Sequence, residues 1–108
     1  MKNTRLEQLR EFLAGQPHDP FLKYAIATEY LKLNDRANAL SWFERLLREH
    51  PDYLGTYYHI GKLYEELGRI REARESYSGG IRLAREQGNQ QTLGELSAAL
   101  LAISEEED

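Results

Sequence analysis

The chain has 108 residues, of which 41% are hydrophobic and 30% charged, a balance typical of a folded globular chain. It contains no cysteine, which excludes disulfide frameworks, zinc–thiolate sites and cysteine nucleophiles. The formal net charge of −4 comes from the four acids at 105–108, so the rest of the chain is balanced and has no bulk preference for nucleic acid or an anionic membrane. No apolar run approaches the length of about 18 residues that a membrane-spanning helix needs. We therefore expect a cytoplasmic protein that contacts neither nucleic acid nor membrane.

The first expected helix covers residues 4–14. Thr4 and Glu7 have the spacing of a capping box, in which each side chain satisfies a free backbone amide at the start of a helix. The next helix start lies at Asp19, because aspartate is a favoured N-cap residue, and Pro20 is well suited to the first turn that follows.

Residues that end or start helices also mark the later elements. Asn34 and Gly68 tolerate the left-handed backbone of a helix C-terminus and predict turns between paired helices. Pro51 follows another helix, where a proline prevents further winding. Thr92 and Glu95 again have capping-box spacing and predict the start of a last helix.

Most of the chain repeats itself at an offset of 34 residues. At this offset apolar and small residues fall on residues of the same kind; the pairs include Tyr24 and Tyr58, Ile26 and Ile60, Tyr30 and Tyr64, Ala39 and Ala73, and Phe43 and Tyr77. Each repeat contains two helical stripes, as the spacing of Tyr57, Ile60, Gly61 and Tyr64 illustrates. The last helix continues this pattern, with the same spacing in Leu93, Leu96, Ser97 and Leu100.

This pattern resembles the tetratricopeptide repeat, a helix–turn–helix of about 34 residues. The family's first helix has a large, an apolar, a small and an aromatic residue, which match Tyr57, Ile60, Gly61 and Tyr64 here. In the earlier repeat Lys23 replaces the usual aromatic residue, although its methylene stem can still cover apolar surface. The resemblance implies an all-α fold, a right-handed α-solenoid of six helices.

The repeats also predict the domain organisation. We expect a single domain over residues 1–104 and an acidic tail over 104–108. The expected parts of the domain are an N-terminal half repeat at 4–17, repeat 1 at 20–53, repeat 2 at 54–87 and a C-terminal capping helix at 92–103.

The resemblance implies a protein–protein interaction module, an adaptor or scaffold that binds a peptide or a helix. In such arrays the first helices line a concave groove, which here would hold Phe21, Tyr24, Thr28, Lys32, Tyr58, His59, Lys62 and Glu66. Tyrosine suits recognition, because it combines a large rigid surface with a hydroxyl group. The alternative for Tyr24 and Tyr58 is that both pack between adjacent helices.

The ends of the array suggest a different function, a structural unit that self-associates. A repeat array buries its core by stacking, so a terminal helix without a neighbour can leave apolar residues uncovered. The candidates are Leu9 and Phe12 in the first helix and Leu100 in the last. Pairing through these residues would give a homo-oligomer.

The sequence predicts no catalytic site, metal or cofactor. His18, His50 and His59 lack the spacing of metal ligands. Arginines gather in repeat 2, but Arg71 with Glu75 and Arg82 with Glu86 have the i, i+4 spacing of ion pairs, which predicts a solvated, paired face. Binding of phosphate or nucleic acid at these arginines is the alternative.

Overall fold

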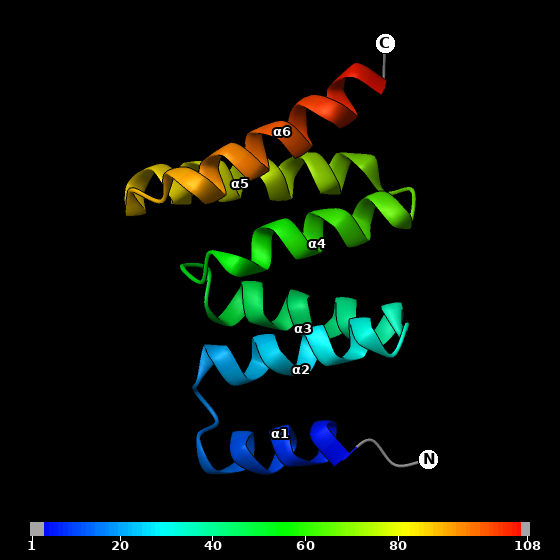
Figure 1. The fold of residues 1–108 in the computed structure, drawn as a ribbon, viewed down its shortest axis with the longest axis vertical. Coiled ribbons are helices and arrows are strands. Elements are labelled where there is room, and N and C mark those ends of the chain that lie inside the picture. The colour runs from blue at the N-terminus through cyan, green and yellow to red at the C-terminus, as the bar shows by residue number, and fades with distance from the viewer. Residues whose placement is uncertain (1–3, 107–108) are drawn as a thin grey trace. The chain divides into compact units, whose positions relative to one another are not determined.

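The computed structural model describes the backbone of residues 4–106 and the side chains of residues 4–104. Within this range the chain forms six α-helices and no strand (Figure 1), which confirms the all-α prediction. The helices are α1 (Thr4–Gly15), α2 (Pro20–Lys32), α3 (Arg36–Glu49), α4 (Gly55–Glu66), α5 (Ile70–Gln87) and α6 (Gln90–Glu106). None of the described helices is both long and apolar enough to cross a bilayer.

The chain divides into two compact units between Tyr53 and Leu54, the point at which the two full repeats adjoin in the sequence. The first unit contains α1, α2 and α3, and the second contains α4, α5 and α6. In the first unit α2 packs against both α1 and α3, and in the second α5 packs against both α4 and α6.

Local capping sets the helix ends of the first unit. The Asp19 carboxylate accepts a hydrogen bond from the backbone amide of Phe21 at 2.9 Å, as expected for an N-cap followed by proline. Asn34 adopts a left-handed backbone with φ of 62°, and Asp35 then caps α3 by accepting from the amide of Asn38 at 3.1 Å. The helices of this unit bury an apolar core of Ile26, Ala27, Ala39, Phe43 and Leu46.

Lys23 is buried in the first unit, with only 2% of the residue exposed. Its ammonium donates to Glu49 Oε1 at 2.7 Å and lies 3.1 Å from His50 Nε2. Since an ammonium can only donate, the imidazole nitrogen of His50 must be the acceptor. The position therefore holds a buried, paired cation, and its stem packs as expected from the sequence.

Close helix packing in the second unit depends on two glycines. A Cβ on Gly61 of α4 would lie 2.2 Å from Cε1 of Tyr77, whose ring is fully buried. A Cβ on Gly80 of α5 would lie 2.6 Å from Cβ of Tyr57 and 2.8 Å from Cδ1 of Leu96. These contacts leave no room for a larger residue at either position.

The last helix starts earlier than predicted. It begins at Gln90, because the side chain of Asn89 accepts a hydrogen bond from the amide of Thr92 at 3.0 Å and so caps the helix. The prediction that Thr92 opens this helix was wrong. The helix continues to Glu106, into the expected acidic tail, whose residues 107–108 lie outside the described part of the chain.

Candidate functional site

A hollow of about 350 Å³ lies between α4 and α6 in the second unit. Its lining residues are Tyr58 and Lys62 from α4 and Glu95, Ala98, Ala99 and Ala102 from α6. Tyr58 and Lys62 are four positions apart on α4, and the α6 residues follow one another at steps of three, one and three positions, so each set shares one face of its helix. The hollow is therefore a groove between α4, the first helix of repeat 2, and α6, which repeats the sequence pattern of a first helix. We refer to it as the α4–α6 groove.

Small side chains form the α6 side of the groove. Ala99 is buried, whereas Ala98 and Ala102 are exposed. Because alanine extends only one carbon from the backbone, a partner can approach α6 closely here. Glu95, one turn before Ala98, adds an exposed carboxylate to the lining.

The α4 side of the groove is an aromatic ring held by its neighbours. Tyr58 is half-buried, and its ring centroid lies 6.4 Å from that of Tyr77 and 6.1 Å from that of His59. The Tyr77 hydroxyl in turn donates to Glu65, and burial, together with this bond, raises the pKa of Tyr77 above its ordinary value. These contacts fix the ring of Tyr58 in position before any partner binds.

The cation beside this ring has two contacts of its own. The ammonium of Lys62 lies 5.5 Å from the ring centroid of Tyr58 and 3.7 Å from Glu65 Oε2. A cation at this distance from an aromatic face is attracted by the ring. The groove thus combines an apolar floor, one aromatic wall, one cation and one carboxylate, which suits the binding of an apolar side chain with polar contacts around it.

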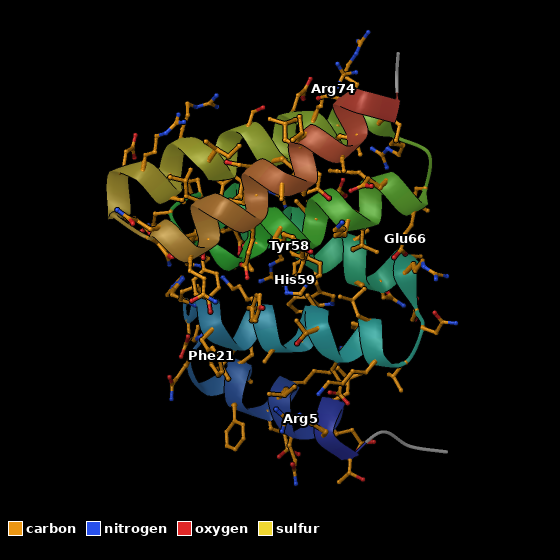
Figure 2. The ribbon with its side chains drawn as sticks, turned by 45° about the horizontal axis from the view of Figure 1, so that its top comes forward. Arg5, Phe21, Tyr58, His59, Glu66 and Arg74 are labelled. Atoms are coloured by element: carbon orange, nitrogen blue, oxygen red, sulfur yellow. The ribbon has the colours of Figure 1, made fainter. Side chains whose placement is uncertain are left out.

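The structure brings together only part of the predicted groove. Of the predicted residues on α4, Tyr58 and Lys62 line the α4–α6 groove, whereas His59 and Glu66 are not among its lining residues. Figure 2 shows Tyr58 beside His59, with Glu66 further along α4 towards its end. His59 is half-buried, and this burial lowers its pKa below the ordinary value of 6.5.

The predicted residues of the first unit differ in their surroundings. The ring of Tyr24 is half-buried, with centroids 6.2 Å from that of Phe43 and 5.5 Å from that of Tyr53, so this tyrosine packs within its own unit. The remaining three are Thr28, whose hydroxyl donates to the Ala25 carbonyl, Lys32, which pairs with Glu29 at 3.9 Å, and Phe21, which is 58% exposed.

The α6 residues of the groove were missed, although the sequence contained a signal for them. The pattern of Tyr57 and Ile60 recurs at Leu93 and Leu96, an offset of 36 residues. At the same offset His59, Lys62 and Glu66 correspond to Glu95, Ala98 and Ala102. These three α6 residues line the groove in the structure. Alanine carries neither a polar group nor a large apolar surface, so nothing in its own chemistry marks it as a contact residue.

The residues predicted to self-associate are not all available. Leu9 is only 6% exposed, because α1 packs this side of its helix against α2, so its prediction as an uncovered end residue was wrong. Phe12, in contrast, is 59% exposed. On the last helix Leu100 is half-buried, and its neighbour Leu101 is 59% exposed.

A family model for the tetratricopeptide repeat matches residues 22–53 and 54–87, which is more than half of the chain. The chain therefore belongs to the tetratricopeptide repeat family, and the resemblance seen in the sequence is confirmed. Both full repeats are matched, with the boundary between Tyr53 and Leu54 at which the two compact units divide.

Several known proteins are similar to this chain in sequence, in structure or in both. A tetratricopeptide repeat domain protein from Salinibacter ruber is 51% identical, with a TM-score of 0.76 over 78% of this chain and 93% of that one. A TPR repeat-containing protein of Pseudomonas aeruginosa is 24% identical over 95 residues, which cover 88% of this chain and 90% of that protein. PcrH, in complex with the chaperone binding region of PopD, is 14% identical, with a TM-score of 0.86 over 95% and 78% of the two chains, and so shares the fold.

Proposed function

We propose that this chain is a protein-interaction module that binds a peptide or a helix of another protein in the α4–α6 groove. The observation that carries the proposal is the lining of this groove, in which a fixed Tyr58 faces the exposed alanines of α6. A bound segment would place an apolar side chain against the ring, with its backbone close to Ala98 and Ala102. Lys62 and Glu95 would set its orientation through opposite charges.

The physical basis of binding is preorganisation. Tyr58 already contacts Tyr77 and His59, so little side-chain freedom is lost when a partner arrives. Aromatic anchors in partly desolvated surroundings commonly supply most of the binding energy of an interface. The complex of PcrH with a region of PopD is the precedent for a protein segment bound on this fold.

The first unit contributes one further candidate. Phe21 is 58% exposed, whereas Tyr24 is half-buried. We therefore propose Phe21, rather than Tyr24, as a second place on the chain where a protein partner makes contact.

The test begins with peptides selected from a random library against the wild-type protein. Affinities of the selected peptides are then measured by fluorescence anisotropy for Tyr58→Ala and Ala98→Arg. We expect each substitution to weaken binding at least tenfold, since one removes the aromatic wall and the other fills the groove; tenfold is about 1.4 kcal/mol.

The matched control is Ser97→Arg, which adds the same charge to the same helix at an exposed residue outside the groove lining. It should leave the affinity within about twofold of wild type, a change of about 0.4 kcal/mol. Equal affinity of wild type, Tyr58→Ala and Ala98→Arg for every selected peptide would show that the groove is not the binding surface.

Exposed apolar side chains on the terminal helices favour self-association as a second candidate function. Phe12 on α1 and Leu101 on α6 each leave 59% of the residue in contact with solvent. Covering such a residue stabilises an assembly by about 1.5–3 kcal/mol. If this is the function, light scattering should give a mass above 12.6 kDa. Phe12→Asp or Leu101→Asp should then return it to the monomer, whereas a constant monomer mass over a hundredfold range of concentration would exclude this candidate.

A further inference from the structure

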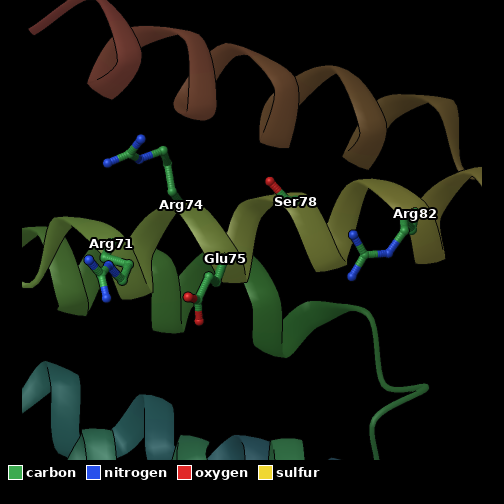
Figure 3. A pocket seen from close by; sticks show the side chains of 5 residues that line it. All are labelled: Arg71, Arg74, Glu75, Ser78 and Arg82. Carbon is green, nitrogen blue, oxygen red and sulfur yellow. The ribbon is translucent and has the colours of Figure 1, made fainter. Parts of the chain in front are cut away.

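A second hollow, of about 500 Å³, lies along one face of α5 and contains most of the arginines of this helix. Its lining residues are Arg71, Arg74, Glu75, Ser78 and Arg82 (Figure 3). They are spaced by three, one, three and four positions, which keeps them on one side of the helix. We call this surface the arginine face; it shares no residue with the α4–α6 groove.

The arginine face has three cations and one carboxylate, and its charges do not form the ion pairs that the sequence predicts. The pair that does form nearby lies outside this face: Arg69 Nε donates to Glu72 Oε1 at 2.8 Å. Neither Arg71 nor Arg82 forms an ion pair with a side chain among the described residues, so the predicted pairs with Glu75 and Glu86 are absent there. Both guanidinium groups are exposed and have hydrogen-bond donors to offer.

The arrangement of these charges along the helix selects among ligands. Arg71 and Arg82 are eleven residues apart, or about 16 Å along the axis. Figure 3 shows Glu75 and Ser78 between Arg71 and Arg82 along α5, so a negative charge lies between the two positive ones. An extended peptide covers about 16 Å with about five residues. Two acidic groups at that spacing, with a neutral or basic residue between them, therefore match the face.

We propose that the arginine face binds a carboxylate-rich segment of a protein partner, with acids at each end and a non-acidic residue opposite Glu75. Arginine presents its donors in a planar fork that matches a carboxylate. A nucleic-acid strand fits less well, because its phosphates place a negative charge at every nucleotide, including the position opposite Glu75.

Two fluorescein-labelled peptides of the same composition test this pattern, Glu-Glu-Ser-Lys-Ser-Glu-Glu and Lys-Ser-Ser-Glu-Glu-Glu-Glu. Fluorescence anisotropy at low salt should show tighter binding of the first peptide. Arg71→Gln and Arg82→Gln should each weaken that binding about three- to fivefold, as expected for an exposed ion pair. Glu75→Gln should tighten binding of the second peptide, because it removes the negative charge in the middle of the face.

The matched control is Arg48→Gln, which removes one exposed arginine from α3 in the first unit and should leave the affinity unchanged. An equal loss with Arg48→Gln and Arg71→Gln would overturn the proposal, since the attraction would then come from overall charge. Tighter binding of a single-stranded oligonucleotide of equal charge, lost in Arg71→Gln and Arg82→Gln, would also overturn it. Tyr58→Ala should not affect these peptides, so the result is independent of the α4–α6 groove.

Discussion

At the scale of single residues, the buried ammonium of Lys23 is the feature of the core that least resembles the family pattern. A lysine this deeply buried is stable only when its charge is paired. Here Glu49 accepts at 2.7 Å, and the bond holds the pKa of Glu49 below its ordinary value of 4.5. His50 provides a second acceptor from the end of α3. The pair thus joins α2 to the end of α3.

Removing one partner of this pair should be worse than removing both. Glu49→Ala leaves the ammonium of Lys23 buried with one acceptor fewer, and we expect the free energy of unfolding to fall by about 2 kcal/mol. In the background of Lys23→Met the same substitution should cost less than about 1 kcal/mol, because no buried charge remains. Urea unfolding of the four proteins measures this cycle. Equal costs of Glu49→Ala in both backgrounds would contradict the pairing.

At the scale of the helices, packing in the second unit depends on how closely α4 approaches α5. Gly61 makes this possible, because it lies directly against the buried ring of Tyr77. Gly94 of α6 offers a contrast, since a Cβ there would meet no atom within 4 Å. Both glycines are inside helices, so alanine gives each the same gain in helix propensity.

Alanine at these two positions should therefore have opposite effects. Gly61→Ala forces the ring of Tyr77 to move and should lower the free energy of unfolding by about 1–3 kcal/mol. Gly94→Ala should raise it by about 0.5–1 kcal/mol through helix propensity alone. The midpoints of urea unfolding report both changes. Stabilisation by Gly61→Ala would show that the helices are not held as closely as the structure has them.

Most helix ends could be predicted because they depend on local chemistry. The cap at Asp19 and the left-handed turns at Asn34 and Gly68 need only the residue and its neighbours, and all three are present in the structure. The start of α6 could not be assigned in the same way. Asn89 and Thr92 are both favourable N-cap residues. In the structure the side chain of Asn89 accepts from the amide of Thr92, so Asn89 is the residue that caps α6.

At the scale of the whole molecule, the 34-residue offset predicted the family, but not which polar and apolar residues face a partner. Leu9 and Phe12 are both apolar and three residues apart, yet α2 covers one and leaves the other exposed. Tyr24 and Tyr58 occupy equivalent positions, but Tyr58 lines the α4–α6 groove, whereas the ring of Tyr24 lies against those of Phe43 and Tyr53. Such differences depend on the packing of neighbouring helices, which a single sequence does not specify.

The central claim is that partners bind in the α4–α6 groove, and chemical-shift mapping tests it most directly. A peptide selected against the wild-type protein is titrated into the ¹⁵N-labelled chain, and the backbone amide shifts are followed. The account predicts that the largest changes fall on Tyr58, Lys62, Glu95, Ala98 and Ala102, and that they disappear in Ala98→Arg. Large changes confined to other parts of the chain, and retained in Ala98→Arg, would contradict it.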